Sequence, residues 1–213
     1  MQICKLVAET GSKLRRPAVS DGVNSATYSY LANSPLVQNI VFQQNGSTRM
    51  TTTKQDDNLN RLQSISSVPN SQLQSPISNS YAYNDANQRT AVTNVDNSRW
   101  VYLYDKLGQV ISGKRYWADG TPVAGQQFEY GFDDIGKRLS AKAGGDQGGA
   151  ALLPASYSPN LLNQYVSRTV PGAVDIIGSA TNTSTVTVNG QPTSRKGDYF
   201  RGELSMDNSS PRK

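Results

Sequence analysis

Histidine is absent from the 213 residues of this chain, and cysteine occurs once, as Cys4. Without histidine, the chain cannot form a Ser-His or Cys-His catalytic pair or a histidine-ligated metal site. A single cysteine excludes an internal disulfide and a cysteine-based zinc cluster, so Cys4 is predicted to be a free thiol near the N-terminus. No run of 18 apolar residues occurs either, so no membrane-spanning helix is expected.

Charge is also scarce, because only 17% of the residues are charged, and the net charge is +5. The basic residues are scattered, and Lys13, Arg15 and Arg16 form the only tight cluster. A nucleic-acid site requires a contiguous basic stripe with interleaved aromatic residues, whereas the aromatic residues here are assigned to strand faces. The basic residues are therefore predicted to lie on solvated faces and tails, with no nucleic-acid partner.

One short motif recurs along the chain. Its copies are KQDDNLNRL from Lys54, YAYNDANQR from Tyr81, YLYDKLGQV from Tyr102 and YGFDDIGKR from Tyr130, with weaker copies YSYLANSPL and YSPNLLNQY at either end. The second aromatic position recurs at intervals of 27, 21 and 28 residues, at Asp56, Tyr83, Tyr104 and Phe132. Self-similarity at this period indicates a repeat architecture.

Each copy is typical of a β-hairpin. In the copy from Tyr102, Tyr102 and Tyr104 project from one face of a strand, and aromatic side chains favour half-buried pleated surfaces. Asp105 can then accept backbone hydrogen bonds and start a turn, and Gly108 tolerates a positive φ. The sequence therefore predicts an all-β fold, an array of antiparallel hairpins that forms a curved open sheet. Short turns between repeats are expected at Asn45-Gly46 and Asp119-Gly120.

Each position of the motif is predicted to be structural, either as an aromatic residue of a strand or as a residue of a turn. The positions are Tyr28, Tyr30, Asp57, Tyr81, Tyr83, Asn84, Tyr102, Tyr104, Asp105, Gly108, Tyr130, Phe132, Asp133 and Gly136.

The motif resembles the tyrosine–aspartate repeat of the RHS/YD family, which includes bacterial RHS proteins, shell subunits of insecticidal toxin complexes and animal teneurins. The resemblance covers residues 25–170. It implies a spiral of β-hairpins that wraps into a hollow shell, which encloses a C-terminal segment or serves adhesion. The Asp-Pro of the family's self-cleaving core is absent from this sequence, so self-cleavage is not carried over.

The array has about six copies, fewer than a closed shell uses, and is interpreted as a fragment of a larger protein. The N-terminal sequence MQICKLVAETGSKLRRP shows no export signal, since its basic residues follow the apolar stretch. The parent protein is nevertheless expected to be secreted or displayed at a bacterial cell surface. Three segments are predicted: a poorly ordered flank (1–24), the hairpin array (25–170) and a further β segment (171–213).

The last of these segments, 171–213, contains VTVNG followed by KGDYFRGEL and resembles the start of an immunoglobulin-like bacterial surface module. Strands are expected at Thr185–Val188 and around Tyr199–Leu204, with a tight turn at Asn189-Gly190. A complete sandwich requires about seven strands, so the segment is predicted to be incomplete.

Enzyme chemistry has little basis in this sequence. The acidic pairs Asp56-Asp57 and Asp133-Asp134 could serve glycoside hydrolysis, but both lie in the turn position of a repeat, where aspartate has a structural role. Calcium at the turn aspartates stays an alternative, because oxygen-rich loops suit that ion, although no spacing matches a known calcium loop. The prediction is a non-enzymatic protein without cofactor or metal.

The predicted function is that of a structural segment of an RHS/YD-repeat shell or surface protein, which serves encapsulation, adhesion or toxin delivery by its parent. Its partners would be the remainder of that protein and, through open sheet edges, other copies of the chain. A carbohydrate-binding surface module is the alternative. Trp117, beside the turn at Asp119-Gly120, could be partly exposed and stack on a sugar ring.

Overall fold

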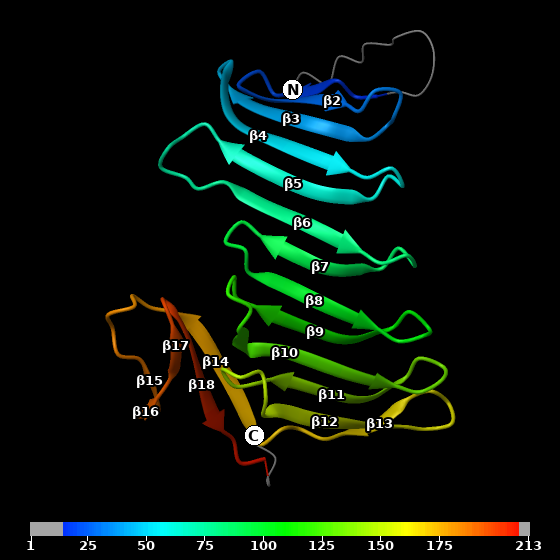
Figure 1. Ribbon diagram of the computed structural model, residues 1–213, viewed down its shortest axis with the longest axis vertical. Coiled ribbons are helices and arrows are strands. Elements are labelled where there is room, and N and C mark those ends of the chain that lie inside the picture. The colour runs from blue at the N-terminus through cyan, green and yellow to red at the C-terminus, as the bar shows by residue number, and fades with distance from the viewer. Residues whose placement is uncertain (1–14, 209–213) are drawn as a thin grey trace. The chain divides into compact units, whose positions relative to one another are not determined.

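The fold is all-β, as the sequence predicts. The computed structural model describes residues 15–208, in which every regular element is a β-strand (Figure 1). No helix in this range could span a membrane. Cys4 and the N-terminal sequence discussed above lie outside the described residues.

The chain divides into two compact units. The first carries six strands, namely β1 (Ala18–Ser20), β2 (Asn24–Tyr30), β3 (Val37–Gln44), β4 (Ser47–Asp56), β5 (Leu62–Pro69) and β6 (Ile77–Tyr83). In the second, the array continues through β8 (Arg99–Tyr104), β9 (Val110–Tyr116), β10 (Pro122–Phe132), β11 (Arg138–Gly144), β12 (Leu152–Pro159) and β13 (Tyr165–Arg168). Strand β7 (Arg89–Asn94) is divided between the units.

Within each unit, every strand of the array pairs with the next one along the chain, always antiparallel. The prediction of an open hairpin array is therefore confirmed. The array begins at β1, inside the flank 1–24 that the sequence assigns to a poorly ordered segment.

A β-bulge recurs just before each motif turn. The register shifts at Ser29/Tyr30, Gln55/Asp56, Leu103/Tyr104, Gly131/Phe132 and Ser158/Pro159. In the β8–β9 hairpin, Tyr104 pairs with Val110 and Leu103 with Ser112, so the return strand has one extra residue. A bulge of this kind reverses the in–out alternation of the return strand, and it places residues three apart on one face.

The aromatic residues of strands β8, β10 and β12 gather on one face of the sheet of the second unit, here called the aromatic face. Trp100 stacks on Tyr102 with ring centroids 6.4 Å apart, and on Phe128 of β10 at 6.0 Å. Offset-stacked aromatic pairs of this kind contribute beyond the area that they bury. Burial raises the pKa of Tyr102 above its usual value. Trp100 therefore packs between strands, and the aromatic stripe links neighbouring hairpins.

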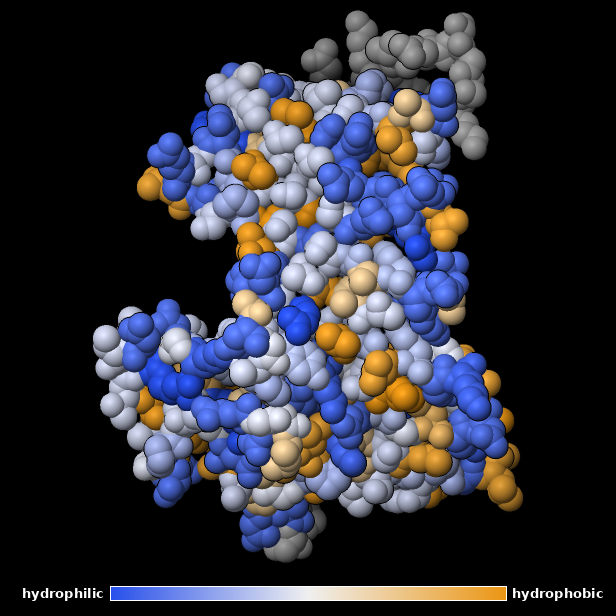
Figure 2. All heavy atoms as spheres, viewed as in Figure 1, coloured by the Kyte–Doolittle hydropathy of each residue, from blue (hydrophilic) through white to orange (hydrophobic). Residues whose placement is uncertain are grey.

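A single sheet buries few side chains completely. Among the described residues, the buried hydrophobic residues are Val123, Ala124 and Ala155, whereas most strand residues are half-buried. The surface is accordingly mixed, with apolar residues interspersed among hydrophilic ones (Figure 2). The largest fully buried side chain is polar, that of Gln127.

The C-terminal segment forms two small sheets in the second unit. Strands β14 (Ala173–Ser179), β18 (Tyr199–Ser205) and β17 (Ser194–Lys196) pair in that order, and β15 (Thr187–Val188) pairs with β16 (Gln191–Pro192). The three-stranded sheet stands beside the ends of β9–β12 that lie opposite the motif turns (Figure 1). Five short strands are fewer than the seven of an immunoglobulin sandwich.

The connecting turns follow the expected chemistry at two of three positions. Asn45-Gly46 and Asn189-Gly190 each form a two-residue turn in which both residues have positive φ. Asp119-Gly120 differs from the two-residue turn that the sequence suggests. Here the Trp117 N–H donates to the carbonyl of Thr121, which makes a five-residue loop in which only Gly120 has a positive φ.

Candidate functional site

The repeated turn is the most regular site in the molecule. Six hairpin loops share one five-residue geometry. Five of them start with Asp or Asn, at Asp57, Asp105, Asp133, Asp146 and Asn160, and the sixth starts at Trp117. In each, the N–H of the first residue donates to the carbonyl of the fifth, and the N–H of the fourth donates to the carbonyl of the first. The fourth residue always has a positive φ, from 60° at Asn60 to 84° at Gly136, which explains the preference for glycine or asparagine.

In the five loops that start with Asp or Asn, the side chain of the first residue holds the turn together. Asp133 Oδ1 accepts hydrogen bonds from the N–H groups of Ile135 (3.1 Å) and Lys137 (2.8 Å). The same pair of bonds forms at Asp57, Asp105, Asp146 and Asn160. The side-chain oxygen therefore satisfies two backbone donors that the loop leaves free, as an N-cap does in a helix.

The sequence pattern missed one of these turns. Asp146 begins the loop between β11 and β12, in the sequence DQGG, with no aromatic pair before it. The Asp-x-x-Gly spacing could have revealed this turn.

The predicted copy at Asn84 has the expected backbone. Asn84 directly follows β6, and Asn87, three residues further on, has a φ of 60°, as at the equivalent positions of the other copies. In the last copy, Pro159 pairs with Tyr165 and thus takes the second aromatic position, so Tyr157 takes the first.

Asp133→Ala should lower the free energy of unfolding by about 1–2 kcal/mol, because two backbone donors lose their acceptor. Asp134 provides a matched control, since its side chain is exposed and Asp134→Ala should change stability by less than about 0.5 kcal/mol. Denaturant unfolding of both variants measures the difference. Equal losses would show that the carboxylate does not hold the turn.

Tyrosine hydroxyls at the second aromatic position link each repeat to the one before it. Tyr83 Oη donates to the carbonyl of Leu62 at 2.8 Å, and Tyr104 Oη donates to the carbonyl of Arg89 at 2.8 Å. Each acceptor lies five residues after the first residue of the preceding turn, since Leu62 follows Asp57 and Arg89 follows Asn84 at that distance. Phe132 occupies the same position without a hydroxyl. The second tyrosine of the motif is thus a connector between hairpins as well as an apolar surface.

Tyr83→Phe should cost about 0.5–1.5 kcal/mol, the net contribution of one partly buried hydrogen bond, because the ring stays and only the donor is removed. Tyr28→Phe, at the first aromatic position, is the control and should change the free energy of unfolding by less than about 0.5 kcal/mol. Thermal or urea melts compare them. A larger loss for Tyr28→Phe would contradict the connector role of Tyr83.

The fifth turn residue connects neighbouring turns. Arg61 Nε pairs with Asp57 Oδ2 at 2.6 Å, while its Nη1 donates to the carbonyl of Asn84 at 3.3 Å. Lys137 Nζ likewise donates to the carbonyl of Asn160 at 3.4 Å. The turns are therefore joined in a row by side chains, in addition to the backbone ladder.

Glycine in the turn also has a packing reason. A Cβ added at Gly108 would lie 3.1 Å from Nε2 of Gln88, and one at Gly136 would lie 3.3 Å from Oε1 of Gln109. Each contacting glutamine is the fifth residue of the preceding motif. The third residue of the turn points to solvent instead, so Leu107 and Ile135 are 66% and 68% exposed.

Hydrogen bonding lowers the pKa of Asp57 below the usual aspartate value. The main cause is the Arg61 backbone N–H, and the Arg61 side chain and the Leu59 N–H act in the same direction against desolvation. The stabilisation linked to Asp57 is therefore complete above the unfolded-state pKa, about 3.9. It is lost as the pH falls through the lower folded-state pKa.

Stability measured from pH 6 down to pH 2 should accordingly fall less steeply in Asp57→Asn than in the wild type, because the variant no longer takes up that proton on unfolding. Urea unfolding at each pH gives the comparison. An NMR titration of Asp57 with a midpoint at or above the ordinary aspartate value would contradict the assignment.

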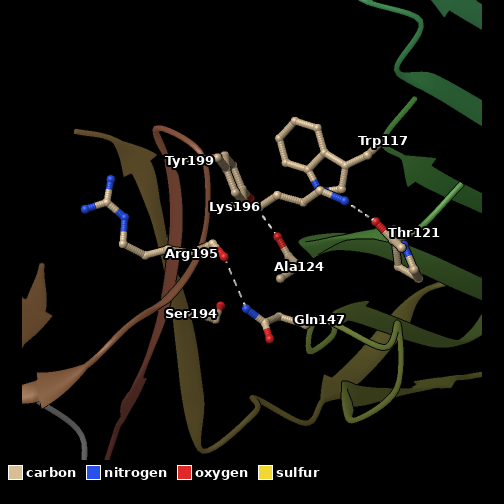
Figure 3. A pocket seen from close by; sticks show the side chains of 9 residues that line it. Trp117, Thr121, Ala124, Gln147, Ser194, Arg195, Lys196 and Tyr199 are labelled. Atoms are coloured by element: carbon tan, nitrogen blue, oxygen red, sulfur yellow. Dashed lines mark hydrogen bonds between the residues drawn. The ribbon is translucent and has the colours of Figure 1, made fainter. Parts of the chain in front are cut away.

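A second site lies where the C-terminal sheet meets β9 and β10, around Trp117 (Figure 3). Trp117 is half-buried, and the edge of its ring system meets Tyr199 with centroids 5.5 Å apart and planes at 73°. Lys196 Nζ lies 5.8 Å from the Trp117 ring centroid and pairs with Asp119. Tyr199 Oη donates to the carbonyl of Ala124 at 2.6 Å, which ties the two sheets together.

The pocket at this junction, here called the Trp117 pocket, has a volume of about 260 Å³. Trp117 and Tyr199 supply its aromatic wall, and the side chains of Gln147, Ser194 and Lys196 supply polar groups (Figure 3). Gln147 Nε2 donates to the carbonyl of Arg195 at 3.5 Å, a weak contact. The pocket is smaller than the roughly 300–1,000 Å³ of sites for drug-sized ligands, so its capacity is about one ring.

No metal centre emerges from the part of the chain that the structure describes. In residues 15–208, no three His, Cys, Asp or Glu side chains come close enough to hold an ion together. Of the acidic pairs in the sequence, Asp57 and Asp133 hold turns, as described above. The turn oxygens are thus engaged by backbone N–H groups.

Comparison with known proteins gives a fold match only. No family model and no curated protein matches this chain. Among solved structures, it matches a chain in the crystal structure of TcdB2-TccC3-Cdc42 with a TM-score of 0.57 and 11% identity, over 89% of this chain and 10% of that one. A chain in the crystal structure of TcdB2-TccC3 without hypervariable C-terminal region matches with a TM-score of 0.55 and 12% identity, over 86% and 8%.

The protein thus shares the fold of a part of those chains and spans about a tenth of their length.

Proposed function

We propose that this chain is a non-enzymatic structural segment of an RHS/YD-repeat shell in a toxin-related protein. The observation that carries the proposal is the repeated turn, in which the first Asp accepts N–H groups of its own turn and the fourth residue has a positive φ. The second tyrosine of the motif donates to a carbonyl of the preceding repeat, and Lys137 donates to one of the next. These are the positions by which the sequence resembles the RHS/YD repeat. The fold match to chains in TcdB2-TccC3 structures supports the same assignment.

The strand order favours assembly with further hairpins. β13 is the last strand of its sheet, and all four of its residues are exposed. An unpaired strand edge presents free N–H and C=O groups, which pair readily with another strand. The partner is the remainder of the parent protein, and in its absence a second copy of the chain.

Light scattering of the isolated chain at low micromolar concentration tests this edge role. Oligomers are expected, and Val166→Pro in β13 should reduce them, because proline removes a donor and blocks strand addition. Val95→Pro, in the turn between β7 and β8, is a surface control that leaves the β13 edge intact. A monomer with a cooperative melt would contradict an incomplete shell segment.

The shell role itself is tested in the full-length parent. Electron microscopy should show a hollow particle in which this segment forms part of the wall, and protease accessibility on intact bacterial cells should place the parent outside the cytoplasm. A solid globular particle, or turnover of a glycoside substrate that is lost in Asp133→Asn, would overturn the structural role.

Carbohydrate binding at the Trp117 pocket is the second candidate function. The observation in its favour is the half-buried Trp117 ring beside the amide of Gln147 and the hydroxyl of Ser194, a mixture of apolar and polar groups that suits one sugar ring. A glycan array with the wild type and Trp117→Ala tests it. Binding that is lost in Trp117→Ala and retained in Trp100→Ala would support it, and an array without hits would exclude it.

A further inference from the structure

The two faces of the β8–β13 sheet carry different charge. On the aromatic face, the register places Arg115 level with Trp100, Arg138 opposite Phe132 and Arg168 opposite Tyr157. The opposite face carries Lys114 and Lys142, and both pair with Glu129, at 2.6 and 3.5 Å.

No Asp or Glu of β8–β13 lies on the aromatic face, since Glu129 is the only acidic residue in those strands. Glu129 therefore offsets part of the positive charge of Lys114, Lys142 and Arg99 on the opposite face, whereas no acidic strand residue offsets the three arginines of the aromatic face.

Two of these arginines stack on tyrosine rings close to the motif turns. The Arg138 guanidinium carbon lies 4.8 Å from the Tyr130 centroid and 6.0 Å from the Tyr157 centroid. That of Arg168 lies 5.5 Å from the Tyr157 centroid. Tyr130, Arg138, Tyr157 and Arg168 form a group here called the arginine–tyrosine cluster, in which two cations flank one ring.

The cations of this cluster have no anionic partner in the described chain. Neither Arg138 nor Arg168 forms an ion pair, and neither side chain donates a hydrogen bond to another described residue. Arg138 Nε is buried without an acceptor, while Arg168 is exposed. A guanidinium has five donors in a fixed fork, and stacking on an aromatic ring holds that fork in place.

We propose that the arginine–tyrosine cluster binds the carboxylates of an extended acidic polypeptide segment. Charge complementarity is the first argument, because a stacked guanidinium with open donors binds a carboxylate through two parallel hydrogen bonds. Position is the second, because Arg168 belongs to β13, whose outer edge can pair with an added strand. A segment that adds along β13 brings alternate side chains over the aromatic face.

A polypeptide fits this site better than a nucleic acid does. Single-stranded nucleic acid requires a groove that neutralises the backbone over several nucleotides. The aromatic face has three arginines spread over six strands, of which Arg115 already donates to Gln126 and Ser98. Two adjacent guanidinium groups match two carboxylates of one short segment.

Fluorescence anisotropy with the full chain tests the proposal. The probe is a labelled peptide of alternating Glu and Ser, with a Gln-Ser peptide and oligo(dT) of equal length as comparators. Binding of the Glu-Ser peptide is expected to weaken with added salt, because salt shortens the distance over which exposed charges attract one another. Arg168→Gln and Arg138→Gln should each weaken it about fivefold or more, as the loss of a charge-assisted contact predicts.

Arg99→Gln is the matched control. Arg99 also stacks on a ring, with its guanidinium carbon 5.8 Å from the Tyr116 centroid, but it lies on the opposite face. Its substitution removes the same charge and should change affinity by less than about twofold. Circular dichroism checks that each variant is folded, and Arg168→Gln alone decides the matter if Arg138→Gln unfolds, because Arg168 is exposed.

Three results would overturn the proposal. The first is equal binding of the Gln-Ser peptide, or none of either peptide at low salt. The second is an equal loss in Arg99→Gln, which would mean that only net charge matters. The third is tighter binding of oligo(dT) with the same dependence on Arg138 and Arg168, which would make this face a nucleic-acid site.

Discussion

Gln127→Leu should lower the free energy of unfolding by about 2–4 kcal/mol, since two buried carbonyls lose their donor at about 1–3 kcal/mol each and the added apolar burial offsets part of that. Gln127 is 1% exposed, and its Nε2 donates to the carbonyls of Arg115 (2.8 Å) and Val123 (3.0 Å). The Val123 carbonyl lies within the irregular stretch of β10 between Pro122 and Gln127, where the register with β9 shifts, and Arg115 lies opposite this stretch on β9. The glutamine amide fills and satisfies this bulge.

Gln74→Leu is the control, because Gln74 is exposed and the same chemical change there should alter stability by less than about 0.5 kcal/mol. Urea unfolding followed by circular dichroism gives both values. Gln127→Glu adds a second comparison, since it keeps the size but replaces the donor with a carboxylate that cannot donate when ionised. A stable Gln127→Leu protein would mean that water, rather than the side chain, satisfies the bulge.

Gly144→Ala should destabilise the protein by about 2–5 kcal/mol, the sum of about 1–2 for a left-handed backbone and about 1–3 for overpacking. Gly144 has a φ of +97°, and an added Cβ would overlap Oδ2 of Asp175. Asp175 accepts from Arg201 Nε at 2.6 Å, and these two side chains are 15% and 11% exposed. The Cβ would therefore push against a mostly buried ion pair that holds β14 to β18.

Gly190→Ala separates the cost of the left-handed backbone from the cost of overpacking. Gly190 has a φ of +75° with no atom within 4 Å of an added Cβ, so only the conformational cost of about 1–2 kcal/mol is expected there. Urea melts give the difference, and the excess in Gly144→Ala measures the packing between the end of β11 and the C-terminal sheet. Equal losses would show that Asp175 moves aside freely.

The hairpin array was readable from the sequence because its causes are local. Aromatic residues two apart, then Asp and three residues later Gly or Asn, specify a strand and a turn through alternation, one carboxylate and one positive φ. Asp57, Asp105 and Asp133 each lie at the start of such a turn. The Asn45-Gly46 and Asn189-Gly190 turns are equally local.

The orientation and burial of other side chains depend on bulges and on contacts with other strands. Arg138 is a polar repeat residue in the sequence, and only the bulge opposite Phe132 brings it to the aromatic face. No motif in the sequence marks Gln127 as a buried residue, yet the β10 bulge buries it. Likewise, Trp117 reads as a partly exposed aromatic residue, and only contact with Tyr199 makes it the wall of a pocket.

By itself, the sequence determined the all-β class, the hairpin unit and the identity of its turn residues, since these follow from alternation and from hydrogen bonds within five residues. The tertiary structure decided the faces of the return strands, the bonds between repeats and the junction of the C-terminal sheet. A one-residue bulge reverses every following side chain, and no local pattern records which partner a strand will meet.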